Sequence, residues 1–145
     1  MMIMIQNILD RKGAKVFTIR ATDTVQSAAD RMHQHDVAAL VVNSGDAIKG
    51  VISERDIVRA VSRHGGGALS LSVLDVATHA MVTVSPRDSL KRAMGLMTDH
   101  RLRHLPVIAK GSLVGIVSIG DVVKVRLEDL ETEANVLRDK YIAAR

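Results

Sequence analysis

The sequence predicts an α/β fold of two pseudo-symmetric repeats followed by a C-terminal helix. Residues 8–59 recur 65 positions later, without a gap, at 73–124. The two segments share 13 identities over 52 aligned residues, where unrelated sequences of average composition share about three. An internal repeat of this length indicates two similar structural units. We therefore expect repeats at residues 5–64 and 70–127, packed as one module, and a helical extension at 128–145.

Each repeat begins with a short strand and a helix. The strands are predicted at 16–19 and 81–84, and a polar turn follows each of them. Thr24 and Ser89 then stand in N-cap positions, where a side-chain oxygen accepts a hydrogen bond from a backbone N–H. The apolar residues that follow have the three- and four-residue spacing of one helix face: Val25, Ala28, Ala29 and Met32, then Leu90, Ala93, Met94 and Met97.

A pair of strands and a second helix complete each repeat. The strands are expected at 38–42, 49–52, 104–108 and 113–117. Two of them, 38–42 and 113–117, do not alternate apolar with polar residues, which predicts strands covered on both faces. The second helices begin near Ser53 and Ser118, and Gly65–Gly67 predicts a flexible break between the repeats.

The chain continues past the second repeat as a segment without Gly or Pro, 123–145. Its apolar residues alternate spacings of four and three, which is typical of a coiled-coil seam: Val123, Leu127, Leu130, Ala134, Leu137 and Tyr141. Such a helix either folds back on its own repeats or packs against a second copy. We expect the second arrangement, and hence a homodimer.

Composition narrows the classes of function. The chain is 47% hydrophobic and 25% charged, which is typical of a globular protein, and no apolar run is long enough to span a membrane. It has no cysteine, which excludes disulfides and thiolate metal sites and favours the cytoplasm. The histidines lack partners at metal-ligand spacing, so no metal is expected. A net charge of +4 permits nucleic-acid binding. Phe17 and Tyr141 are the only aromatic residues on which bases could stack, so a nucleic-acid-binding protein is the less favoured hypothesis.

The motif Gly-x-x-Ser-x-x-Asp closes both repeats, at Gly50–Asp56 and Gly115–Asp121. Its hydroxyl falls at a helix N-terminus, where unpaired N–H groups and the helix dipole favour an anion. Its carboxylate, one helical turn later, can accept hydrogen bonds from both vicinal hydroxyls of a ribose. A purely capping role for the serine and aspartate is the alternative. Neither serine has a general base nearby in sequence, so we expect a binding protein, not an enzyme.

The doubled unit with these motifs resembles a tandem pair of cystathionine-β-synthase (CBS) domains, a Bateman module of the stand-alone bacterial type. The segments Ile52–Val58 and His100–Val107 are also typical of that family, and the resemblance covers about residues 5–127. It implies an energy- or redox-sensing regulatory protein that binds an adenosine ligand in the cleft between its repeats: AMP, ADP, ATP, NAD(H) or S-adenosylmethionine. The alternative is a free regulatory subunit of a nucleotide-dependent enzyme or transporter, and the sequence does not identify the regulated partner.

The resemblance further implies two unequal nucleotide sites, each with residues from both repeats. In one site Ser118 and Asp121 bind the ribose, beside Ile116, and Arg103 and His104 lie near the phosphate. The base of that ligand contacts residues of the first repeat: Phe17, Val37, Ala38 and Ala39.

In the other site Ser53 and Asp56 take the ribose, Arg55 supplies the positive charge, and Val82 and Leu102 lie beside the base. The positions that match Arg103 and His104 are alanines here, and a guanidinium is the better partner for a phosphate. We therefore expect a monophosphate at Asp121, and weaker binding or a dinucleotide at Asp56.

Overall fold

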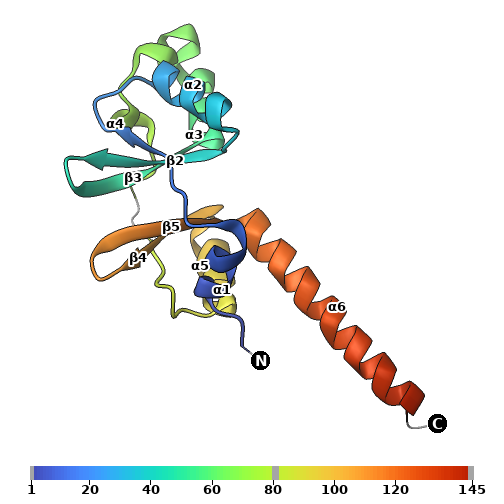
Figure 1. Cartoon of the computed structure of the whole chain (residues 1–145). Helices are drawn as coiled ribbons and strands as arrows, with labels where there is room; N and C mark the ends of the chain where they lie inside the picture. Colours follow the sequence, from blue (N-terminus) through green and yellow to red (C-terminus); the bar gives the residue numbers. More distant parts are fainter. Residues whose placement is uncertain (1, 80–81, 144–145) are drawn as a thin grey trace. The chain divides into compact units, whose positions relative to one another are not determined.

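The computed structural model describes residues 2–79 and 82–143 (Figure 1). The chain forms two compact units. The first-repeat unit is Lys15–Thr83, and the second-repeat unit combines Met1–Ala14 with Val84–Arg145. The N-terminal segment therefore belongs to the unit of the second repeat, although it precedes the first repeat along the chain.

The first-repeat unit is built on a three-stranded sheet. Strand β2 (Ala39–Ser44) lies in the centre, parallel to β1 (Thr18–Arg20) and antiparallel to β3 (Ala47–Ser53). The unit also contains three α-helices and a 3-10 helix: α2 (Val25–His35), α3 (Glu54–His64), η1 (Gly65–Ser70) and α4 (Val73–Val76). Its core is formed by buried apolar side chains of β2, β3, α2 and α4, among them Leu40, Ile52, Ala28 and Val73.

The second-repeat unit contains a two-stranded antiparallel sheet of β4 (His104–Ala109) and β5 (Ser112–Ser118). Its helices are α1 (Ile5–Lys12), α5 (Leu90–His100) and α6 (Ile119–Ala143). Three side chains of α1 are buried: Ile5, Ile8 and Leu9. A Cβ added at Gly115 would lie 2.6 Å from a methyl carbon of Leu9, so the small residue of the second motif makes room for α1.

Helix α6 extends away from the rest of its unit (Figure 1). Within α6 only Val122 and Val125 are buried, and every described residue from Leu130 onward is exposed. None of the helices in the described ranges is long and apolar enough to cross a membrane.

Both helix caps predicted from the sequence are confirmed. Thr24 accepts a hydrogen bond from the Ser27 N–H, and Ser89 accepts one from the Arg92 N–H. The motif helices α3 and α6 begin directly after Ser53 and Ser118, as expected.

The strand predicted at 81–84 is wrong for the residues that the structure describes, because 82–84 form no strand. Met81 lies outside the described residues, and Val84 forms only an isolated parallel bridge with Val107. The ladder does not continue past Val84 because Pro86 has no N–H, whereas the equivalent residue of the first repeat, Ala21, donates its N–H to the Asn43 carbonyl at 2.8 Å.

The predicted break at Gly65–Gly67 also differs from expectation, because these residues start the 3-10 helix η1. Gly65 has φ +61° and donates its N–H to the Val61 carbonyl, which ends α3. The side chain of Ala68 is fully buried, so η1 is held against the unit instead of forming an open linker.

Candidate functional site

The motif residues Ser118 and Asp121 cap the start of α6 reciprocally. Asp121 Oδ2 accepts a hydrogen bond from the Ser118 N–H at 2.8 Å, and Ser118 Oγ accepts one from the Asp121 N–H at 3.1 Å. The capping role that the sequence left open is therefore present. It uses only one of the two carboxylate oxygens.

The same oxygen of Asp121 also binds Lys12, the last residue of α1. Lys12 Nζ lies 2.7 Å from Asp121 Oδ2 and 2.9 Å from the carbonyl oxygen of Ile116. The two charged side chains are 30% and 24% exposed. No described residue donates a hydrogen bond to Asp121 Oδ1, so this oxygen can still accept one from a ligand.

The electrostatic surroundings keep Asp121 ionised. Partial burial by itself raises the pKa of this carboxyl group. The hydrogen bonds from Lys12 and from the Ser118 backbone, together with the positive charge of Lys12, outweigh that effect and hold the pKa below its ordinary value. Asp121 is therefore an anionic acceptor at neutral pH.

Asp56, the equivalent residue of the first repeat, is more completely enclosed, with only 5% of the residue exposed. Its Oδ2 accepts hydrogen bonds from the Ser53 N–H at 2.9 Å and from Ser53 Oγ at 3.0 Å. Its Oδ1 accepts one from the Thr78 hydroxyl at 3.1 Å, and an Arg59 nitrogen lies 3.9 Å away. Both oxygens of Asp56 thus have partners within the first-repeat unit.

Strand pairing places the expected phosphate and base residues beside the motif serines. In the second-repeat unit His104 is the register partner of Ser118, and the Ile119 N–H donates to the Arg103 carbonyl at 2.8 Å. In the first-repeat unit Ala39 pairs with Ser53 in the same way. There the N–H after the motif serine donates to the Ala38 carbonyl at 3.0 Å. The two repeats therefore present equivalent positions, with Arg–His in one and Ala–Ala in the other.

The expected base-contacting residues of the first repeat lie at the edge of its core. Phe17 and Val37 are partly buried against it, and the Phe17 ring stacks on the His35 ring with centroids 4.0 Å apart. Lys15 Nζ lies 5.0 Å from the centroid of the same ring. The combination of these residues with Ser118 and Asp121 in one site stays a prediction, because they belong to different units.

The remaining predicted residues are placed as follows. The side chains of Arg55 and Arg103 are exposed, and Val82 and Leu102 are half-buried. An exposed guanidinium can be reached by a ligand, whereas the two apolar residues offer limited surface. The roles of Arg55, Val82 and Leu102 at the Asp56 site, and of Arg103 at the Asp121 site, stay predictions.

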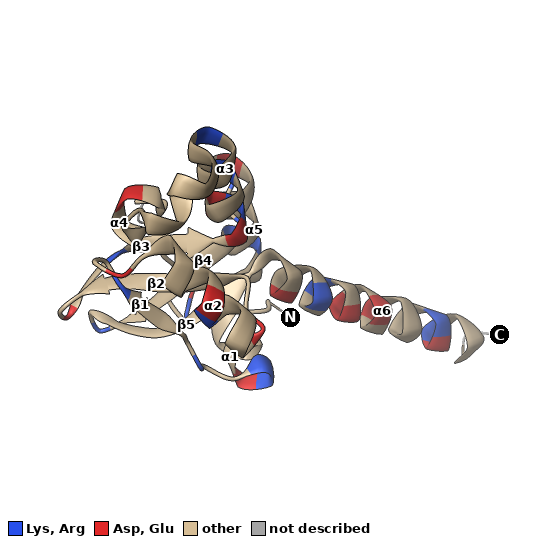
Figure 2. Ribbon diagram, turned by 90° about the horizontal axis from the view of Figure 1, so that it is seen from above, with Lys and Arg blue, Asp and Glu red and all other residues tan. Residues whose placement is uncertain are grey.

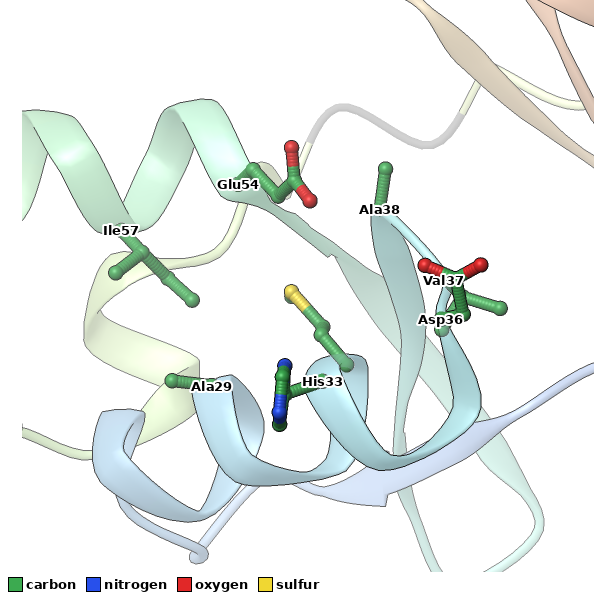
Figure 3. A pocket seen from close by; sticks show the side chains of 8 residues that line it. Ala29, His33, Asp36, Val37, Ala38, Glu54 and Ile57 are labelled. Atoms are coloured by element: carbon green, nitrogen blue, oxygen red, sulfur yellow. The ribbon is translucent and has the colours of Figure 1, made fainter.

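A pocket of about 340 Å³ opens in the first-repeat unit between α2, the start of β2 and the start of α3 (Figure 3). Two of the expected base-contacting residues, Val37 and Ala38, line it. Its other apolar residues are Ala29, Met32 and Ile57, and its polar residues are His33, Asp36 and Glu54. An apolar pocket with a few polar groups is the usual form of a small-ligand site.

Three side chains of the motif surroundings were not found by sequence reasoning: Lys12, Arg59 and Thr78. Arg59 is three residues after Asp56, a spacing that places both on one helix face and could have indicated the contact. Lys12 and Thr78 come from segments far from their aspartates in sequence, so no local spacing points to them. Among the residues that the structure describes, no three His, Asp or Glu side chains gather in a way that could hold a metal ion.

Comparison with known families agrees with this geometry. The sequence model of the CBS domain matches residues 5–63 and 73–128. The chain belongs to the CBS domain family. The resemblance drawn from the repeat and its motifs is thereby confirmed, as is the mixed α/β fold with two CBS repeats and a C-terminal helix.

Individual relatives support the same assignment. The mitochondrial CBS domain-containing protein CBSX3 of Arabidopsis thaliana is 45% identical over 107 residues, which are 70% of this chain and 52% of that protein. The chain thus spans about half the length of that relative. The CBS domain-containing protein YhcV of Bacillus subtilis is 34% identical over 115 residues, covering 79% of this chain and 81% of YhcV.

Solved structures show the same architecture. The crystal structure of the CBS-domain containing protein ATU1752 from Agrobacterium tumefaciens superposes with a TM-score of 0.83 at 38% identity. The superposition covers 87% of this chain and 95% of ATU1752. That protein's chain therefore consists almost entirely of the part that matches this one.

Proposed function

We propose that this CBS pair is a regulatory protein that binds an adenosine nucleotide, with Asp121 as the principal ribose acceptor, and that it acts as a homodimer and not as an enzyme. The difference between the two motif carboxylates carries the proposal. Asp121 is partly exposed and keeps Oδ1 unpartnered among the described residues, whereas Asp56 is buried with partners on both oxygens. The two motifs have the same sequence pattern but unequal capacity for a ligand.

The surroundings of Asp121 suit a nucleotide monophosphate. The ionised carboxylate can accept hydrogen bonds from the ribose hydroxyls, at about 1.5–3 kcal/mol for each bond to a charged group. Arg103 and His104 stand beside Ser118 through the strand register, and Lys12 adds a further positive charge. A guanidinium binds two phosphate oxygens together, which favours the anionic part of AMP.

Binding at Asp56 is expected to be weaker. A ribose hydroxyl there would have to replace the Thr78 hydroxyl or the Ser53 hydroxyl, because each carboxylate oxygen already accepts a hydrogen bond from a side chain. Exchanging one hydrogen bond for another yields little net free energy.

A nucleotide can regulate a partner protein only to the extent that it binds one arrangement of the chain more tightly than another. A regulatory role therefore requires a change in conformation or in partner affinity when the nucleotide binds. A pull-down with and without AMP measures this directly, and identical partners in both samples would argue against regulation.

Calorimetric titration with AMP tests the proposed site. The Asp121→Asn variant should bind AMP at least tenfold more weakly, because one acceptor atom and the negative charge are lost while an amide oxygen can still cap α6. The matched variant Asp56→Asn should change the AMP affinity of the Asp121 site less than threefold. Far-ultraviolet circular dichroism of both variants checks that they fold.

Two outcomes would contradict the proposal. Unaltered AMP affinity in Asp121→Asn would reduce the second motif to a helix cap. Failure of the wild-type protein to bind AMP, ADP, ATP, NADH and S-adenosylmethionine would exclude the adenosine-sensing function itself.

A further inference from the structure

Helix α6 presents an apolar stripe whose leucines are exposed. We call Val123, Leu127, Leu130, Ala134, Leu137 and Tyr141 the α6 seam. Leu127 is 55% exposed and Leu137 is 67% exposed. The helix contacts its own unit through another face, which carries the buried residues Val122 and Val125. The exposed leucines of the seam, Leu127, Leu130 and Leu137, are therefore available to a partner.

The seam follows a heptad repeat. With Leu127 at position a, Leu130 and Leu137 fall at position d, where leucine favours two-stranded coiled coils. From Val123 to Tyr141 the seam is about 27 Å long at 1.5 Å per residue. Val136 and Ile142, the other exposed large apolar residues beyond Leu130, fall outside it. The apolar pattern alone does not specify the direction of the partner helix.

The charges beside the seam indicate whether the partner helix is parallel or antiparallel. The flanking e and g positions carry two basic, then two acidic, then two basic residues: Lys124, Arg126, Glu131, Glu133, Arg138 and Lys140. Figure 2 shows both basic and acidic residues along α6. In a coiled coil these positions face the partner helix and determine its orientation.

A parallel partner in the same register matches this pattern. In that arrangement each g residue faces the e residue of the next heptad on the other helix. Arg126 then faces Glu131 of the second copy, and Glu133 faces Arg138 of the second copy. Two-fold symmetry repeats both attractive pairs. Arg126 already binds Asp129 of its own helix at 2.8 Å, but a guanidinium has five donors and can bind a second carboxylate.

An antiparallel partner fits less well. With the seams fully overlapped, equivalent positions face one another, so Glu131 meets Glu131 of the second copy and Arg126 meets Lys140 of the second copy. Like charges in these places are unfavourable. Sliding one helix by a heptad brings opposite charges together but leaves the end of each seam uncovered.

We propose that α6 pairs with α6 of a second copy of this chain as a parallel, in-register coiled coil. This inference rests on the homodimer proposed above and specifies how it is built. The two-fold axis then runs along the α6 pair, so both copies carry their second CBS repeat at the same end of the coil.

Single-cysteine variants test the direction, because the chain has no cysteine of its own. In a parallel, in-register pair each seam residue faces its own equivalent, so Leu130→Cys and Leu137→Cys should each form a disulfide-linked dimer on mild oxidation. Thr132→Cys, on the opposite face of the helix, is the matched control and should not. Cross-linking only in a mixture of Leu130→Cys with Ala134→Cys would show an antiparallel pair and overturn the inference.

Sedimentation of the full chain separates this inference from the homodimer on which it rests. A dimer in which neither seam cysteine cross-links would overturn the α6 pairing and leave the homodimer intact. A monomer with α6 intact would overturn both.

Charge reversal gives a second test. The double variant Glu131→Lys/Glu133→Lys should dimerise at least tenfold more weakly, and adding Arg126→Glu/Arg138→Glu should restore dimerisation. The control Thr132→Lys/Asp139→Lys adds positive charge on the outer face and should leave dimerisation within threefold. Equal weakening by the control would show a general charge effect and contradict the proposed pairing.

Discussion

The ion pair between Lys12 and Asp121 connects the N-terminal helix to the second motif, and its strength can be measured by a double-mutant cycle. The variants are Lys12→Met, Asp121→Asn and the double variant. Lys12→Met keeps most of the apolar stem of the side chain and removes the charge together with its hydrogen bonds to Asp121 Oδ2 and the Ile116 carbonyl. Lys91→Met, an exposed lysine of α5, is the control for loss of a surface charge.

The structure gives the expected size of the coupling. Fully exposed ion pairs contribute about 0.2–1 kcal/mol, and a hydrogen bond to a charged group contributes about 1.5–3 kcal/mol. The contact is 2.7 Å long between side chains that are 30% and 24% exposed, so it lies between these two cases. We expect a coupling free energy of about 1–2 kcal/mol in urea unfolding at pH 7.

The pH dependence has a definite sign. Asp121 has a lower pKa in the folded protein than its ordinary value, so its ionised form stabilises the fold at neutral pH. That contribution is fully present above the unfolded value of about 3.9. It is lost as the pH falls below that value and through the lower folded pKa. Because Lys12→Met removes the main lowering influence, it should raise the pKa of Asp121, as seen in a carboxyl-carbon NMR titration.

Two results would refute this reasoning. Distant, independent sites are additive to within about 0.3–0.5 kcal/mol, so a coupling inside that range at pH 7 would mean that the ion pair does not stabilise the unit. A coupling of the same size at pH 3 and pH 7 would show that it does not depend on the charge of Asp121.

Three further predictions concern the motif glycines, the phosphate site and the tail. Gly50→Ala should lower the free energy of unfolding by about 2–3 kcal/mol, because its Cβ would lie 2.3 Å from the Thr78 carbonyl oxygen. Gly115→Ala should lower it by only about 1 kcal/mol, because its Cβ meets a flexible leucine side chain, and equal losses in urea unfolding would contradict this. In calorimetry, Arg103→Ala should weaken AMP binding at the Asp121 site more than at the Asp56 site, and two identical, independent sites would argue against the asymmetry. Removal of residues 129–145 should weaken dimerisation in sedimentation without abolishing nucleotide binding, and an unchanged dimer would exclude the tail from the interface.

Local patterns in the sequence were enough to determine most elements of each repeat. Thr24 and Ser89 cap their helices as expected, because a cap depends on a hydroxyl and an N–H three residues apart. The 65-residue repeat, its Ser–Asp motifs and the heptad spacing of α6 are likewise visible in the chain alone. The prediction of a longer strand at 81–84 did not take into account Pro86, which cannot donate the next hydrogen bond of the ladder.

Only the tertiary structure decided how the two motif carboxylates differ. In sequence, Gly50–Asp56 and Gly115–Asp121 share one pattern, and the unequal sites expected there rested on Arg103 and His104, not on the carboxylates. Their partners come from segments 109 and 22 residues away, Lys12 for one aspartate and Thr78 for the other. Spacing rules for helices and strands relate only residues a few positions apart. Folding places Lys12 of α1 in the second-repeat unit and Thr78, which follows α4, in the first-repeat unit. A cation beside one carboxylate and a hydroxyl beside the other make the two sites chemically different, because each aspartate is surrounded by side chains distant from it in sequence.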